Sequence, residues 1–208
     1  MDPIYLDHNA TTPLLPEVVD AMLPFLLEHF GNPSSTHPYG IRARNAVARA
    51  REQVAAALGC EPEEILFTSG GTEANNLAIR GVLEALAGMG RLVTTAIEHP
   101  ATARACAWLE RHGRGVTRLG VDGDGRVRLD EARHAIDRNT ALVTVMHSNN
   151  ETGVLQPIAE LAGLAHGADA LVHTDAAQSL GKVPVRVGDL GVDLLLEPHV
   201  DRRGGVVE

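Results

Sequence analysis

Aromatic side chains, lysines and cysteines are all scarce in this sequence of 208 residues. Aromatic residues make up 3%, and Lys182 is the only lysine among 18 basic residues, the others being arginines. Cys60 and Cys106 are too few for a disulfide framework, so we expect a reducing compartment and a cytoplasmic protein. No apolar run is long enough to cross a bilayer, and the start of the chain lacks the basic and apolar segments of a signal peptide.

The charge balance and the histidine pattern limit the classes of partner. The formal net charge is -9 at pH 7, which argues against a nucleic acid or an anionic membrane, because both need a basic surface. Ten histidines are present, but no pair has zinc-site spacing with a supporting cysteine or glutamate, so we predict no metal. Asp122 to Gly125 hints at a calcium loop, but the remaining ligands are missing and we predict a tight turn.

The apolar pattern alternates between strands and helices through most of the chain. We predict strands at residues 4–6, 65–68, 92–95, 116–119, 142–146, 171–174 and 192–196. We predict helices from Pro16, at 39–58 with Gly59 as a left-handed cap, and at 74–86, 101–111, 129–136 and 158–165. Strands separated by helices are typical of a mainly parallel sheet with helices on both faces, so we assign the chain to the α/β class.

Polar side chains follow four of the predicted strands, where open α/β sheets bind their ligands. Ser69 to Thr72 offers glycine amides and hydroxyls to a phosphate, and His99 can stack on a flat ring or move protons. Asn149 to Gly153 and Gln178 offer neutral amide donors to a ring hydroxyl. Asp175 can hold a proton on a pyridine nitrogen, which lets the ring withdraw electrons from a bound amino acid.

Each of these stretches also has an ordinary structural interpretation. Asp175 can begin a turn or cap a helix, and glycines occur wherever a chain bends sharply between a strand and a helix. His99 can be a hydrogen-bonded structural residue, and the asparagines can form a simple turn. Their conjunction at one edge of a sheet favours a ligand, and a phosphate cradle, a ring partner, amide donors and a carboxylate together suit pyridoxal phosphate.

Six motifs in order along the chain carry a resemblance to a known family. They are Tyr5 to Pro13, Gly31 to Ser35, Phe67 to Asn76, Glu98 with His99, Asn149 to Gly153, and His173 to Gln178. These motifs resemble the cysteine desulfurases of the class V aminotransferase fold, most closely the NifS-like and IscS-like enzymes. The resemblance runs from Ile4 to about Leu195. It implies the large domain of an aspartate aminotransferase-like, pyridoxal phosphate-dependent transferase, incomplete in this chain.

The resemblance implies an activity and a role for individual residues. In the family, pyridoxal phosphate accepts L-cysteine, and an active-site cysteine takes the sulfur as a persulfide while L-alanine leaves. By position, Gly71 and Thr72 are expected to bind the phosphate, and His99 to stack on the ring and assist proton transfer as the catalytic residue. By the same resemblance, Asn150 and Gln178 are expected to contact the phenolic oxygen of the cofactor, and Asp175 is expected to contact its pyridine nitrogen.

The sequence departs from the family pattern after the strand at 192–196. There the family has a Ser-x-His-Lys segment whose lysine forms a Schiff base with the cofactor, whereas Val200 or Asp201 stands at that position here. Lys182 matches a different family lysine. We therefore expect residues 1–195 to be the N-terminal part of the cofactor-binding large domain and 196–208 to be an aberrant or disordered tail, with the small C-terminal domain absent.

The functional expectations follow from the resemblance and from this departure. We expect a cysteine desulfurase that supplies sulfur to an acceptor such as an iron–sulfur scaffold protein, and that is a homodimer when complete. We expect the chain alone to be inactive, since an amine nucleophile is required. A catalytically silent partner subunit or fragment is one alternative. Selenocysteine lyase or another class V lyase is a second, because the cofactor motifs barely distinguish the substrate.

Overall fold

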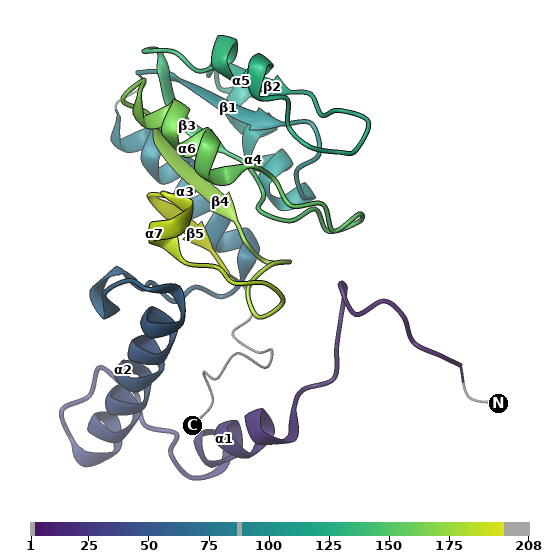
Figure 1. Cartoon of the computed structure of the whole chain (residues 1–208). Coiled ribbons are helices and arrows are strands. Elements are labelled where there is room, and N and C mark those ends of the chain that lie inside the picture. The colour runs from purple at the N-terminus through teal and green to yellow at the C-terminus, as the bar shows by residue number, and fades with distance from the viewer. Residues whose placement is uncertain (1–2, 87–88, 198–208) are drawn as a thin grey trace. The chain divides into compact units, whose positions relative to one another are not determined.

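The structure is a computed structural model that describes residues 3–86 and 89–197. It divides into two compact units, the first holding the residues up to Leu66 and the second those from Phe67 onward (Figure 1). Within the described ranges, no helix is both long enough and apolar enough to cross a membrane. The predicted tail lies outside the described residues from position 198 on.

The first unit is helical. It contains α1 (Pro16–Leu27), α2 (Pro38–Leu58) and a short 3₁₀ helix, η1 (Pro62–Glu64). Pro16 stands at the first helical position of α1, where its missing amide hydrogen costs nothing, as predicted. The predicted cap of α2 is also confirmed, because Gly59 ends the helix with φ 74° and donates its N–H to the carbonyl of Ala55.

Two strand predictions in the first part of the chain are wrong. Neither Ile4–Leu6 nor Ile65–Thr68 belongs to a strand, because no neighbouring strand pairs with them in the part of the chain that is described. After η1 the backbone is extended and then turns into the following helix. The amide and the hydroxyl of Ser69 both donate to the carboxylate of Glu73, each at 2.6 Å, so Ser69 is bonded to the first turn of the helix and not to a neighbouring strand.

The second unit is an α/β layer structure, as predicted. Its strands are β1 (Arg91–Thr95), β2 (Val116–Leu119), β3 (Thr140–Thr144), β4 (Leu171–Asp175) and β5 (Leu194–Leu196). Its helices are α3 (Gly71–Ala85), α4 (Pro100–Arg111), α5 (Leu129–Ala135), α6 (Ile158–His166) and α7 (Val187–Leu190), of which α7 was not predicted. All strand pairs are parallel, in the order β2-β1-β3-β4-β5.

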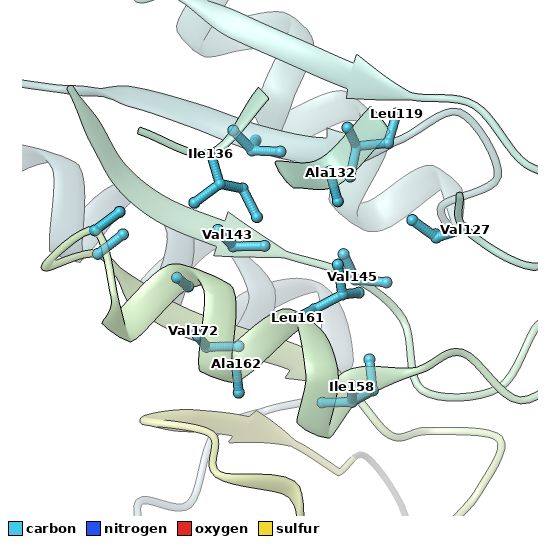
Figure 2. Packing of buried hydrophobic residues seen from close by; sticks show 14 residues of the cluster. Leu119, Val127, Ala132, Ile136, Val143, Val145, Ile158, Leu161, Ala162 and Val172 are labelled. Carbon is cyan, nitrogen blue, oxygen red and sulfur yellow. The ribbon is translucent and has the colours of Figure 1, made fainter. Parts of the chain in front are cut away.

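Helices cover both faces of this sheet, and consecutive strand residues serve opposite faces. Val143 packs into the cluster under α5 and α6, together with Leu161 and Val172 (Figure 2). Its neighbour Leu142 packs into the other cluster, formed with α3 and α4. A strand buried on both sides therefore reads as a continuous apolar run, which is why β3 could be predicted from sequence although its limits are shifted by two residues.

The strand order creates a switch point at one edge of the sheet. From β1 the chain passes through α4 to β2 on one side, and it then returns to β3 on the other side of β1. The connection that follows β1 packs on the α3 face, whereas the connection that follows β3 leads to α6 on the opposite face. The carboxyl ends of β1 and β3 are thus the switch point at which open parallel sheets bind ligands.

Candidate cofactor-binding site

Asp175 ends β4 as a buried carboxylate held by two neutral donors. Its Oδ2 accepts from the side-chain amide of Asn75 at 3.0 Å, and its Oδ1 accepts from the amide of Ala177 at 3.1 Å. The residue is 6% exposed, and within residues 3–86 and 89–197 no cationic side chain forms an ion pair with it. A buried carboxylate without a cation is costly, so this group is suited to a ligand that brings a positively charged N–H.

The amino end of α3 is brought to the same place, because Asn75 lies in its second turn. Gly70 precedes the helix with φ 156° and ψ 176°, a conformation that is essentially restricted to glycine. Gly71 is half-buried and Thr72 is exposed, and the amides of this first turn have no acceptor within the helix. Free amides and a hydroxyl at a helix amino end form a site for an anion such as a phosphate.

His99 caps α4 through its ring. Its Nδ1 accepts from the amide of Ala101 at 3.2 Å, so in the neutral ring the proton is on Nε2 and the histidine can donate to a ligand from that atom. The structural interpretation and the ligand interpretation of His99 are therefore compatible. His99 and Thr72 line one cavity of about 370 Å³ between α3 and α4. Its other walls include Asn76, Arg80, Arg104 and Trp108.

The segment after β3 uses its two asparagines differently. Asn149 is buried, and its Oδ1 accepts from the amides of Glu151 and Thr152, both at 3.0 Å. Its Nδ2 donates to the carbonyl of Ile97, which joins the β3 end to the β1 end. Asn149 thus forms the turn, while Asn150 is half-buried and donates to the Glu151 carboxylate at 2.9 Å.

Gln178 follows Asp175 in the turn after β4. Its Oε1 accepts from Nζ of Lys182 at 2.7 Å. Because the oxygen is engaged by an ammonium group, the amide of Gln178 is oriented with its Nε2 as the donor. That orientation is the one a phenolic oxygen of a ligand requires.

The chain matches a known protein family over most of its length. The family model for aminotransferase class V matches residues 4–197. The chain belongs to this family. Cysteine desulfurase IscS of Dictyoglomus turgidum is 49% identical over 193 residues, which cover 92% of the chain and 49% of that protein. Human cysteine desulfurase is 48% identical over 195 residues, which cover 93% of the chain and 43% of that protein.

Solved structures are similar to the chain over most of its length. A NifS-like protein matches with a TM-score of 0.88 and 38% identity, over 91% of the chain and 53% of that protein. A structure described as SspA in complex with cysteine matches with a TM-score of 0.89 and 40% identity, over 93% and 56%. The chain therefore spans about half the length of the relatives it matches.

Class V aminotransferases are pyridoxal phosphate enzymes, and the residues described above fit this cofactor. The carboxylate of Asp175 is buried and lacks a cation, which suits a protonated pyridine nitrogen. The α3 amino end with Thr72 suits the phosphate, and His99 lines the cavity that begins beside Thr72. Gln178 presents an amide donor beyond the same strand. The described lining of this cavity includes Thr72 and His99 but not Asp175, Asn150 or Gln178.

Several residues of this site were not assigned from sequence. Asn75 binds Asp175 directly. It lies in the buried stripe of α3, whose next members are Ile79 and Leu83, and this position is the feature of the sequence that could have indicated its role. A polar side chain in an apolar stripe needs a partner. Glu98 was noticed only as part of a motif, although its carboxyl group lies between two strand ends. No local pattern predicted those partners.

The calcium-like loop is a turn, as expected. The carboxylate of Asp122 accepts from the amides of Asp124 and Arg126, at 3.0 and 2.9 Å. Val121 and Val127 form an antiparallel bridge across this turn. The aspartate therefore satisfies backbone donors in the turn. Among the described residues, no three histidine, cysteine, aspartate or glutamate side chains are grouped as a metal site.

Proposed function

We propose that the protein is a cysteine desulfurase, which removes sulfur from L-cysteine to give L-alanine and an enzyme persulfide. The observation that carries this proposal is the buried carboxylate of Asp175, held by Asn75 of α3 in a chain that is 49% identical to a curated cysteine desulfurase. One solved relative is described in complex with cysteine. These facts favour an amino-acid substrate with a sulfur-bearing side chain.

The residues of this chain divide the binding work among themselves. When bound, pyridoxal phosphate supplies an electron-withdrawing ring that stabilises negative charge on the substrate. Asp175 would keep the pyridine nitrogen protonated, and the α3 amino end with Thr72 would hold the phosphate. His99 would contact the ring, with the proton of its neutral form on Nε2. Asn150 and Gln178 would donate to the phenolic oxygen.

The cellular setting is part of the proposal. We place the protein in the cytoplasm as a homodimer in its complete form, which delivers sulfur to an acceptor such as an iron–sulfur scaffold protein. Relatives named cysteine desulfurase IscS support the delivery role. The net charge of -9 is consistent with a partner that is neither a nucleic acid nor an anionic membrane.

Cofactor binding by Asp175→Asn tests the carrying observation. The variant keeps the shape of the side chain but cannot hold a proton on the ring nitrogen by its charge. We expect the affinity of the purified chain for pyridoxal phosphate, followed by absorbance and fluorescence, to fall about tenfold or more. Asp169→Asn, an exposed aspartate after α6, is the matched control. Equal affinity of both variants and the wild type contradicts the assignment.

Turnover tests the activity itself. In a protein completed to the length of its relatives, we expect L-alanine to form from L-cysteine faster than from L-selenocysteine. A preference for selenocysteine identifies a selenocysteine lyase instead. For the 208 residues alone we expect cofactor binding without alanine release, because Lys182 is their only lysine and its Nζ is bonded to Gln178.

A further inference from the structure

Glu98 lies at the switch point of the sheet, and its carboxyl group joins two strand ends. Oε1 accepts from the hydroxyl of Thr95, the last residue of β1, at 2.6 Å. The same oxygen accepts from the amide of Met146, two residues beyond β3, at 3.1 Å. Oε2 is buried and has no hydrogen-bond partner in the part of the chain that is described. The residue as a whole keeps some exposed surface, so it is the carboxyl end that is enclosed.

The surroundings of this carboxyl group favour its neutral form. No ion pair to Glu98 is present among the described residues, and the titratable groups placed against it are Asp175 from β4 and Cys106 from α4. The pKa of Glu98 is raised to about 8, mainly by burial and to a smaller extent by the negative charge of Asp175, against the opposing hydrogen bonds from Thr95 and Met146. At neutral pH the group is therefore a carboxylic acid, with its proton on the unpartnered Oε2.

We infer that Glu98 is a positioning residue whose carboxyl group fixes the β1 end against the β3 end and thereby holds His99 and Asn150 in place. His99 is the next residue in the chain, and Asn150 follows Met146 by four positions. The bond from Asn149 to the carbonyl of Ile97 makes a second tie between the same two segments. The tie between the two segments does not depend on the proposed function. Only the binding roles of His99 and Asn150 rest on it.

The neutral state of Glu98 also matters for Asp175. Two ionised carboxylates in one buried site repel each other, so one of them is displaced toward the protonated form. With Glu98 neutral, no second negative charge competes with the Asp175 carboxylate for a positively charged N–H of a ligand. In this proposal Glu98 has a structural role, and Asp175 binds the cofactor.

Amide hydrogen exchange tests the tie without any cofactor. We compare the wild type with Glu98→Gln, whose Oε1 still accepts both bonds, and with Glu98→Leu, which fills similar space without an acceptor. At one fixed pH, we expect the Met146 amide to exchange about tenfold or more faster in Glu98→Leu and to stay protected in Glu98→Gln. Glu160→Leu, an exposed site in α6, is the control and is expected to leave Met146 unchanged. Equal protection of Met146 in Glu98→Leu and the wild type overturns the inference.

The pH dependence of stability tests the neutral form. A folded pKa near 8, above the unfolded value of 4.5, means that the folded state retains a proton that the unfolded state has lost. The resulting stabilisation is full below the unfolded pKa and is lost as pH rises through the folded pKa. Relative to the wild type, Glu98→Gln should therefore gain stability as pH rises from 5 to 9, seen as a lower unfolded fraction in urea. A constant difference between the two across this range overturns the neutral-acid assignment.

Cofactor affinity then links the tie to the site. We expect Glu98→Leu to bind pyridoxal phosphate about tenfold more weakly and Glu98→Gln to restore most of the affinity. A folded Glu98→Leu that binds the cofactor as tightly as the wild type contradicts the positioning role. If the wild type itself binds no cofactor, the proposed function fails, while exchange at Met146 and the pH series still decide the role of Glu98.

Discussion

Asn75 in α3 and Asp175 at the end of β4 are a hundred positions apart in the sequence, and their side chains meet at 3.0 Å. The bond fixes the amino half of α3 beside the carboxylate of Asp175. One hydrogen bond therefore holds together the two groups that we propose bind the phosphate and the pyridine nitrogen. Asn75 is 1% exposed, so its side-chain amide is buried and needs a hydrogen-bond partner inside the protein.

Asn75→Ala should weaken both the fold and the site. The substitution leaves Asp175 with one donor and opens a gap in the buried stripe of α3, so we expect the free energy of unfolding to fall by about 1–3 kcal/mol. Pyridoxal phosphate affinity should fall about tenfold, because the carboxylate and the helix end are no longer tied. Chemical denaturation and cofactor titration measure the two effects. Asn139→Ala, at an exposed position before β3, should change neither, and an Asn75→Ala affinity equal to the wild type contradicts the assignment.

Gly70→Ala should destabilise the start of α3 through the backbone alone. No atom lies within 4 Å of the position that a Cβ would take, so the cost comes from φ 156° and not from a clash. Such a conformation costs a residue other than glycine about 1–3 kcal/mol, which thermal or urea unfolding detects. Weaker phosphate and pyridoxal phosphate binding should accompany the loss, because the amides of the first turn shift.

Gly163→Ala is the matched control with the opposite expected sign. Gly163 lies within α6, where a Cβ also meets nothing within 4 Å and the backbone is helical. Alanine is a better helix former there, so we expect a gain of about 0.5–1 kcal/mol in the free energy of unfolding. If both glycine variants lose the same stability, the special conformation of Gly70 is not the cause.

His173 should make the protein sensitive to mild acid. The ring is buried, and its Nδ1 is hydrogen-bonded to the hydroxyl of Thr144 at 2.8 Å. Burial lowers its pKa to about 4, although the negative charge of Asp175 opposes the shift. The unfolded state takes up a proton near pH 6.5 and the folded state does not, so stability is present above pH 6.5 and is lost as pH falls toward 4.

A variant without a titrating ring isolates this effect. In His173→Asn, which keeps a polar group near Thr144, the free energy of unfolding should vary less between pH 6.5 and 4.5 than in the wild type. Urea denaturation at several pH values measures the slope. His134→Asn, on the exposed surface of α5, should retain the wild-type slope. An unchanged slope in His173→Asn shows that another group carries the acid sensitivity.

Sequence reasoning predicted the parts of this fold that local patterns encode. The apolar runs around Val93, Val143 and Val172 lie in buried parallel strands, and Gly59 ends α2 because only a left-handed residue satisfies that turn. Ile65–Thr68 was also predicted to be a strand, and this prediction is wrong. Its composition favours a strand, but a strand also needs a partner, and in the described residues the backbone turns into α3 instead.

The site was predictable as a set of strand ends but not as a set of contacts. The carboxyl ends of parallel strands meet at one edge, so Asp175 and His99 could be assigned to that edge from the alternation of elements alone. The bonds from Asn75 to Asp175 and from Met146 to Glu98 join distant segments, and no periodicity encodes them. The protonation of Glu98 is likewise set by burial, which depends on segments that are distant in the sequence.

Lys182 provides the last prediction, since it is the only lysine and the only side-chain amine in the chain. Its Nζ donates to Oε1 of Gln178, which leaves Nε2 of that amide as the donor that we propose for the phenolic oxygen. We expect Lys182→Met to lower pyridoxal phosphate affinity about two- to fivefold, because an exposed hydrogen bond is worth about 1 kcal/mol or less. Lys182→Arg retains a donor and should lose less. If Lys182 instead reacts with the cofactor, both variants lose the absorbance band of the bound form together, and borohydride treatment of the wild type fixes the label on Lys182. A graded loss therefore means that Lys182 positions Gln178, and an all-or-none loss means that it is the covalent attachment site.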